Sequence, residues 1–292
     1  MGGIEQNERQ WGAYAWSAEG DEWSIRWGGP DYQWFGSLLP RLREFLPAGT
    51  ILEIAPGFGR WTHYLVHLCD RLIGVELTAR CVEACRERFG DQPHATFHKN
   101  DGMSLDMVPD GEVDFAFSFD SLVHCESDVV ESYVHQLARK LRPEGVAFIH
   151  HSNLAAYVDP ETGRLPFPKG GWRAESVSAE LFERVCREAG LLCIGQELLK
   201  WRKRDPWLGD CISMLARPDT RFARDNRIQE NPDFWAEATA LARVADLYGS
   251  QGFPQLEGSA AGMDALSLLR RSRLKAGPRR AARVASAQPP PE

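Results

Sequence analysis

The 292-residue sequence lacks the segments that would place it in or across a membrane. Met1–Gln10 is polar and has no apolar run of the kind found in a signal peptide. No later stretch approaches the ~20 apolar residues that a membrane-spanning helix needs. We therefore expect a cytoplasmic protein with no membrane partner.

The cysteines lack the spacing of a disulfide framework or a zinc site. There are seven, an odd number, and no two form a C-x-x-C pair. Such usage favours reduced thiols packed in the core. Cys81 and Cys85 lie one helical turn apart and could meet a metal only if other ligands joined them.

An excess of positive charge is also absent. The net charge is -7 and the isoelectric point is near 5.7, so the chain as a whole does not attract phosphate backbones. From this we expect no nucleic-acid partner. The hydrophobic share of 43% and the charged share of 26% are ordinary for a globular protein with one principal core.

The first 48 residues lack strand alternation but are rich in glycine and aromatic side chains. We interpret residues 1–48 as an aromatic-rich cap, with a helix over residues 31–45 that ends before Pro47 and Gly49. The tryptophans of this segment are Trp11, Trp16, Trp23, Trp27 and Trp34.

Short apolar runs then alternate with amphipathic segments, which predicts β-α-β units and a doubly wound, mostly parallel α/β sheet. The helical segments cover residues 61–69, 79–89, 128–141 and 179–189. The expected strands are 51–55, 71–76, 95–98, 113–119 and 145–150, with a final pair at 191–201 and 210–216.

Three regions follow from this pattern. Residues 49–217 form the expected core, and within it the Pro- and Gly-rich segment 153–173 is a candidate lid or substrate loop. Residues 218–292 form an expected helical extension, with a helix over 232–248. Its tail, 270–292, is rich in arginine and then proline, a composition typical of disorder.

Chemistry-bearing residues follow successive strands of the predicted sheet. The first strand runs into a turn, L-E-I-A-P-G-F-G over residues 52–59, in which Gly57 and Gly59 allow the backbone to approach a ligand. Glu76 ends the second strand, where a carboxylate can accept both hydroxyls of a ribose. The third strand ends in N-D-G at residues 100–102. All these strand ends lie along the edge at which open α/β sheets bind ligands.

With these motifs, residues 50–217 resemble the class I S-adenosylmethionine-dependent methyltransferases. The resemblance implies that Glu53–Gly59 holds the methionine portion of the cofactor, that Glu76 binds its ribose, and that Asp101 with Gly102 and Met103 contacts adenine. It also implies a seven-stranded sheet with one antiparallel strand. Ala55-Pro56 replaces the usual first glycine and its neighbour. The expected cofactor-binding set is Glu53, Ala55, Gly57, Gly59, Glu76, Leu77, Asn100, Asp101, Gly102, Met103 and Phe119.

A nicotinamide-dependent dehydrogenase is the natural competitor, because it also combines a glycine turn with a carboxylate after the second strand. It requires G-x-G-x-x-G, whereas residues 55–60 are A-P-G-F-G-R. Glu53 is also unexpected in such an enzyme. The pattern therefore favours a methyltransferase.

The segment after the fourth strand suggests how an acceptor could be activated. Amino-methylating nucleic-acid enzymes resemble one another in an Asn or Asp followed by Pro-Pro and an aromatic, but residues 119–122 are F-D-S-L, and there is no Pro-Cys nucleophile. His124 is the first candidate for a general base toward a hydroxyl. The alternative, a structural histidine satisfied by a neighbouring carboxylate, stays open.

His150, His151 and Asp120 complete the candidate catalytic set. His150 and His151 end the fifth strand, and strand alternation points them to opposite faces, so only one is expected to face the acceptor. Asp120 with Glu126 or one of these histidines could bind Mg²⁺, but no spacing requires a metal.

The aromatic cap, with Tyr157, Phe167 and Trp172 in the loop, suggests stacking surfaces, although each ring could equally seal the cap onto the core. The whole chain resembles sugar and natural-product O-methyltransferases, which implies a small-molecule acceptor. N-methylation of a small amine and a catalytically silent scaffold remain alternatives, and the cap could pack against a second subunit in a homodimer.

Overall fold

The computed structural model describes residues 3–167, 172–245 and 247–248. The chain divides into two compact units, Met1–Phe253 and Pro254–Glu292, and every described residue belongs to the first. The expected tail at 270–292 therefore lies outside the described residues.

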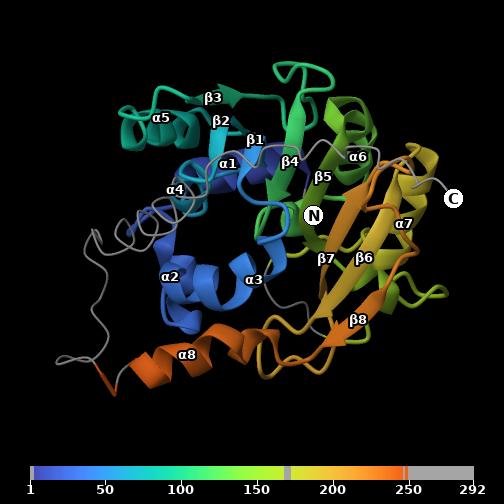
Figure 1. The fold of residues 1–292 in the computed structure, drawn as a ribbon. Helices are drawn as coiled ribbons and strands as arrows, with labels where there is room; N and C mark the ends of the chain where they lie inside the picture. Colours follow the sequence, from blue (N-terminus) through green and yellow to red (C-terminus); the bar gives the residue numbers. More distant parts are fainter. Residues whose placement is uncertain (1–2, 168–171, 246, 249–292) are drawn as a thin grey trace, which may run out of the picture. The chain divides into compact units, whose positions relative to one another are not determined.

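One mixed sheet forms the centre of the described chain (Figure 1). Its strand order is β3-β2-β1-β4-β5-β7-β6-β8, and β7 runs antiparallel to both β5 and β6. The strands are β1 Ala48–Ile54, β2 Cys69–Glu76, β3 Ala95–Lys99, β4 Val113–Ser118, β5 Leu141–Ser152, β6 Leu192–Leu199, β7 Asp210–Ala216 and β8 Ile228–Asn231.

The predicted doubly wound α/β fold is confirmed, with one difference in strand number. The sheet has eight strands rather than seven, because the short strand β8 pairs in parallel with the outer edge of β6 from Gln196↔Ile228 to Leu199↔Asn231. The sequence of β8, I-Q-E-N, is mostly polar and exposed, so it lacks the apolar run by which a buried strand is recognised.

Helices cover both faces of the sheet (Figure 1). On one face, α6 and α7 bury their apolar stripes against Leu52, Ile54 and Ala147 of the strands. On the other, Phe45 stacks on Phe115 of β4 with ring centroids 6.2 Å apart. The helices are α1 Ile4–Ala13, α2 Pro30–Gln33, α3 Leu39–Leu42, α4 Thr62–Leu65, α5 Ala79–Arg88, α6 Ser127–Lys140, α7 Ala179–Glu188 and α8 Glu237–Ala245.

Several helices and strands begin or end at other residues than the sequence predicted. The helix expected at 61–69 is only the single turn α4, because β2 already begins at Cys69. The helix expected at 232–248 is a 3-10 turn, η5 Phe234–Ala236, followed by α8. The strand expected at 145–150 extends to Leu141–Ser152 as β5.

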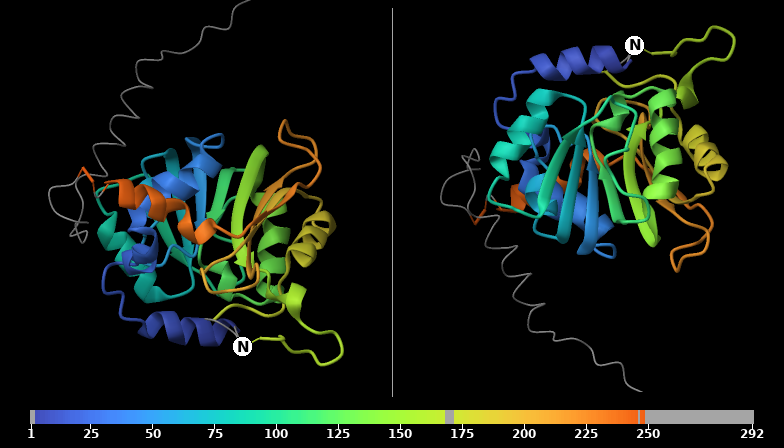
Figure 2. Two further views of the ribbon diagram at one scale, coloured as in Figure 1. Left: turned by 90° about the horizontal axis from the view of Figure 1, so that it is seen from below. Right: turned by 90° about the horizontal axis from the view of Figure 1, so that it is seen from above.

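Residues 3–48, which we expected to form an aromatic-rich cap, contain several short helices. α1 lies across one end of the strands (Figure 2), and the 3-10 helix η1, Asp21–Trp27, follows. The expected helix 31–45 is α2, a π turn η2 at Trp34–Leu38, and α3. Pro40 has no N–H to donate, and the N–H of Leu39 reaches back five residues to the carbonyl of Trp34, so a wider turn accommodates the proline.

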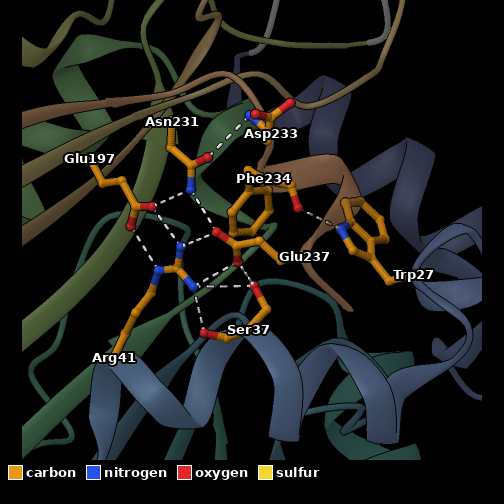
Figure 3. A network of polar contacts seen from close by, with 8 residues as sticks. All are labelled: Trp27, Ser37, Arg41, Glu197, Asn231, Asp233, Phe234 and Glu237. Carbon is orange, nitrogen blue, oxygen red and sulfur yellow. Dashed lines mark hydrogen bonds and ion pairs between the residues drawn. The ribbon is translucent and has the colours of Figure 1, made fainter. Parts of the chain in front are cut away.

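A polar network attaches the C-terminal extension to the rest of the unit (Figure 3). The Arg41 guanidinium donates to Glu197 of β6 at 2.6 and 2.7 Å and to Glu237 of α8 at 2.7 and 2.9 Å. Asn231 of β8 donates to both carboxylates at 2.6 and 2.7 Å. Burial opposes ionisation of Glu197, but the hydrogen bonds from Arg41 lower its pKa. One guanidinium thus joins α3, β6 and α8.

Replacing Arg41 by methionine should destabilise this unit. The variant keeps an apolar stem but leaves two carboxylates, only 19% and 24% exposed, facing each other without a cation. We expect a loss of about 2–3 kcal/mol in the free energy of unfolding, below the full value for a buried pair because water reaches the cluster. Urea denaturation measures it. Arg221→Met, which removes an arginine that is 73% exposed, is the control; equal stability of the two variants would contradict the expectation.

Candidate functional site

A cavity of about 330 Å³ lies at the carboxyl ends of β1, β2 and β4. Its floor comes from the segments that directly follow these strands, as expected for an open α/β sheet. Its walls come from the N-terminal cap and from the segments that follow β5 and β6. The lining residues include Ala55, Gly57, Glu76, Leu77, Gly102, Phe119, Asp120, His124, Trp172, Arg173 and Trp201.

The turn after β1 presents backbone to this cavity. Ala55 and Gly57 line it, both with positive φ angles, 58° and 61°, and the Ser121 hydroxyl donates to the Ala55 carbonyl at 2.9 Å. Gly59, with φ of 88°, does not line the cavity. It packs against Phe89, and a Cβ there would collide with that ring. Gly57 therefore serves the cavity, whereas Gly59 serves the packing of the turn.

Glu76, at the end of β2, contacts the glycine turn and also lines the cavity. Its carboxylate accepts the N–H of Gly57 and the N–H of Thr78, both at 3.0 Å. Burial raises the pKa of Glu76, although these two N–H groups oppose the shift. The carboxylate lines the cavity beside Leu77, where it can accept hydroxyl groups of a ligand.

Of the expected segment after β3, only Gly102 lines the cavity. Asn100 donates to the Ser104 carbonyl and to the Tyr133 hydroxyl, both at 2.9 Å. Asp101 accepts the N–H groups of Met103 and Ser104 at 2.9 and 2.7 Å. The side chains of Asn100 and Asp101 thus hold the turn in shape, and Met103 belongs to that turn without lining the cavity.

Glu53 lies behind the turn rather than in the cavity. Its carboxyl is 1% exposed and accepts the Thr62 hydroxyl at 2.6 Å. Burial raises its pKa to about 8, so the group is largely protonated at neutral pH. The structure places Glu53 as a support between β1 and α4.

Asp120 stands where β4 ends, in a ring of charged side chains. Its φ angle is 60°, and its backbone N–H donates to Nδ1 of His150 at 3.0 Å. Its carboxylate lies 3.0 Å from an Arg60 nitrogen and 3.5 Å from an Arg173 nitrogen. Arg173 also donates twice to Asp210, at 3.0 and 2.9 Å. Two arginines and two aspartates neutralise one another here.

The three candidate histidines have different surroundings. His124 lines the cavity, with Nδ1 2.8 Å from the Trp172 carbonyl and its ring 5.1 Å from that of Trp11. Burial, with the charge of Arg173, lowers its pKa to about 4, so the imidazole is neutral at pH 7. A neutral ring that donates from Nδ1 keeps a lone pair on Nε2.

His150 and His151 point to opposite faces and neither lines the cavity. His150 accepts from Asp120, lies 3.3 Å from Asp210, and stacks against Phe119 at 4.6 Å. His151 contacts the Ser152 carbonyl and the Ser213 hydroxyl at 2.8 Å, and burial lowers its pKa to about 3. Both rings are fully buried because β5 is central in the sheet. His150 therefore holds the backbone of Asp120 in position. His151 has structural contacts, with the Ser152 carbonyl and the Ser213 hydroxyl.

The cap covers the cavity with aromatic rings. Trp16 stacks on Phe58 of the turn with centroids 4.7 Å apart and reaches over Gly57, where a Cβ would lie 3.0 Å from the indole. Trp11, Trp23 and Trp172 also line the cavity. Of the loop aromatics, Tyr157 and Phe167 do not, because Phe167 stacks on Trp207 and the Tyr157 hydroxyl accepts the N–H of Leu208.

Five charged or aromatic residues that were not predicted as site residues also line the cavity: Arg26, Arg60, Arg173, Trp201 and Arg202. They come from four separate segments of the chain, and no sequence motif relates these segments to one another. Arg60, which directly follows the glycine turn, was the one within reach of motif reasoning.

No group of three or more His, Cys, Asp or Glu side chains in the described ranges could hold a metal ion. Nor does any described helix combine the length and apolar character required to cross a bilayer.

Residues 51–145, which run from within β1 through α6 and include the turns just described, match a family model described as a methyltransferase domain. This segment is therefore similar to methyltransferase domains. This match supports S-adenosylmethionine as the cofactor.

Known proteins resemble parts of this chain. Ribosomal RNA small subunit methyltransferase A of Geobacter metallireducens is 39% identical over 73 residues, which are 24% of this chain and only 26% of the relative. An S-adenosylmethionine-dependent methyltransferase of Clostridium acetobutylicum is 14% identical over 66% of this chain and 91% of that chain, with a TM-score of 0.49. The structure of DhpI in complex with S-adenosylhomocysteine is 22% identical in sequence. The match covers 73% of this chain and 96% of that chain, with a TM-score of 0.47.

The first of these relatives corrects one expectation. Several curated relatives are named as methyltransferases of ribosomal RNA, so the exclusion of a nucleic-acid partner was wrong. That exclusion rested on a net charge of -7, which is a sum over the whole chain. Such a sum does not describe one site, and four arginines line this cavity.

Proposed function

We propose that this chain transfers the methyl group of S-adenosylmethionine to an acceptor bound in the same cavity. The observation that carries the proposal is the continuity of the cavity. It runs from Glu76 and Gly102, which follow β2 and β3, to Asp120 and Arg173 beyond β4. A cofactor over β1 and β2 and an acceptor over β4 would share one enclosed space.

The residues of the chain would mainly bind and orient. Bound S-adenosylmethionine supplies an electrophilic methyl group, so an acceptor held in line with it needs little further activation. Holding two reactants in such a geometry can contribute about 7–11 kcal/mol to lowering a barrier. Glu76 and the backbone at Gly57 fix the cofactor side, and the rings of Trp11, Trp16 and Trp172 exclude water.

We further propose that the acceptor atom is a hydroxyl oxygen, as in a sugar, and that His124 accepts its proton. The support is that His124 lines the cavity and is neutral at pH 7, with Nδ1 held by the Trp172 carbonyl. A base with a pKa near 4 is weak. Its contribution therefore belongs at the lower end of the ~10²–10⁴-fold range for general bases, and positioning dominates.

Calorimetric titration with S-adenosylhomocysteine and, separately, NADH tests the core proposal. Binding of the first alone supports it, and binding of NADH alone would overturn it. Transfer of a labelled methyl group is then measured on monosaccharides, phenols, small amines and a ribosomal RNA fragment. Cofactor binding without transfer to any acceptor would favour a catalytically silent scaffold.

Replacing His124 by asparagine tests the base. We expect kcat on a hydroxyl acceptor to fall about 10²-fold because the proton has no acceptor, while the affinity for S-adenosylhomocysteine stays unchanged. His135→Asn, at an exposed position on α6, is the matched control. Unchanged turnover of the His124 variant would contradict the role of His124 as the base. Turnover on amines alone would show that the reaction is N-methylation and not O-methylation.

A further inference from the structure

The acceptor side of the cavity carries more positive than negative charge. Four arginines line the cavity: Arg26 of η1, Arg60 after the glycine turn, Arg173 at the end of the 153–173 loop, and Arg202 after β6. Arg60 is paired with Asp120, and Arg173 is paired with both Asp120 and Asp210. The two aspartates account for two of the four arginine charges.

Arg26 and Arg202 supply the excess. Within the described part of the chain, neither has a carboxylate at ion-pair distance. Partial burial, and then the nearby charge of Arg202, lower the pKa of Arg26. Two like charges held beside one cavity repel each other. A bound anion between them would offset this electrostatic repulsion, which the protein without a ligand retains.

Flat rings line the same cavity as these arginines. The guanidinium of Arg173 lies 4.9 Å from the centroid of Trp201, and Trp201 lies 6.0 Å from Phe119. Trp23 lines the same cavity. Guanidinium groups bind carboxylate and phosphate in bidentate geometry, while indole faces pack on the apolar face of a sugar or on an aryl ring.

From this juxtaposition we infer that the acceptor carries an anionic group, a carboxylate or a phosphate, which Arg26 and Arg202 bind. The inference rests on the proposed function and names the substrate class of the same site. A hydroxyl would face the cofactor while the acid group lies against the two unpaired arginines. Arg26 and Arg202 thus act in acceptor binding and have no role on the cofactor side.

The experiment compares one sugar in three charge states. Glucose, glucose 6-phosphate and glucuronate are titrated, by quenching of tryptophan fluorescence, into the full chain saturated with S-adenosylhomocysteine. We expect at least one anionic sugar to bind 10-fold or more tightly than glucose. The double variant Arg26→Gln/Arg202→Gln should abolish that difference. Arg184→Gln, on α7 and 54% exposed, should retain it.

The arms of the experiment identify the source of the anion. Preference for glucose 6-phosphate indicates a phosphate, and preference for glucuronate a carboxylate. A short single-stranded RNA that binds only through Arg26 and Arg202 would place the phosphate in a nucleic acid. Equal binding of all three sugars, no binding of any ligand, or discrimination that survives the double variant overturns the inference. Absence of S-adenosylhomocysteine binding instead overturns the proposed function, since that step is measured first.

Discussion

Glu76→Gln is expected to weaken the binding of S-adenosylhomocysteine by roughly 30-fold to 1,000-fold. The glutamine keeps the size of the side chain but replaces one acceptor oxygen by a donor. It loses charge-assisted hydrogen bonds to ligand hydroxyls and to the N–H of Gly57. Such losses together are worth about 2–4 kcal/mol, and each 1.4 kcal/mol is tenfold in affinity. Calorimetry at pH 7.5 measures the change.

The matched control for this prediction is Glu112→Gln. Glu112 is 43% exposed, pairs with Arg71, and precedes β4 at the amino end of the strand. We expect it to bind S-adenosylhomocysteine like the unmodified protein. Undiminished affinity in the Glu76 variant would refute the cofactor-binding role, provided that both variants retain the unliganded melting temperature to within a few degrees.

Asp210→Asn is expected to produce the largest loss of stability. Asp210 is 1% exposed, receives two hydrogen bonds from Arg173, and lies 3.3 Å from His150. Removing one partner of a buried charged pair typically costs about 3–5 kcal/mol, because the remaining charge stays buried. For a chain of this size that corresponds to a melting temperature roughly 10 °C lower. Urea denaturation and calorimetric melting give the two values.

The same residue should shape the acid sensitivity of the protein. Burial opposes ionisation of Asp210, but the Arg173 charge and His150 lower its pKa below the ordinary value. A lowered folded-state pKa means that the stabilisation is complete above the unfolded pKa of about 4 and is lost as pH falls through the folded value. The Asn variant should therefore lose less stability than the unmodified protein when the pH falls below 4.

Asp219→Asn provides the comparison for both measurements. Asp219 also pairs with an arginine, Arg217, but is 68% exposed. We expect a change of no more than about 0.5 kcal/mol and an unaltered acid profile. If Asp210→Asn were as stable as this control, the buried network would have no energetic role.

The fold was largely predictable because strand and helix periodicities were clear in the core. Runs such as L-I-G-V-E at residues 72–76 are buried on both faces and bounded by turns, so their strands were found. α1 and β8 were missed for the same reason. No residue of α1 is buried, and β8 is a four-residue polar edge strand, so neither shows the periodicity that marks a buried face.

In the structure, the residues predicted to bind the cofactor fall into two groups. Ala55, Gly57, Glu76, Leu77, Gly102 and Phe119 line the cavity. Glu53, Gly59, Asn100, Asp101 and Met103 instead shape the turns beneath or beside it. A motif names the residues that a turn requires, but it does not separate those that face a ligand from those that hold the backbone.

By itself, the sequence determined the α/β alternation, the glycine turn after β1, and the carboxylate that ends β2, since each depends on neighbours within a few residues. Only the tertiary structure decided the side of the cavity at which we propose that the acceptor binds. Arg26, Arg173, Trp201 and Arg202 meet there from segments up to 176 residues apart in number, such as positions 26 and 202. Their meeting depends on the crossing of β7 between β5 and β6 and on the cap folding back over the strand ends, and local spacing encodes neither.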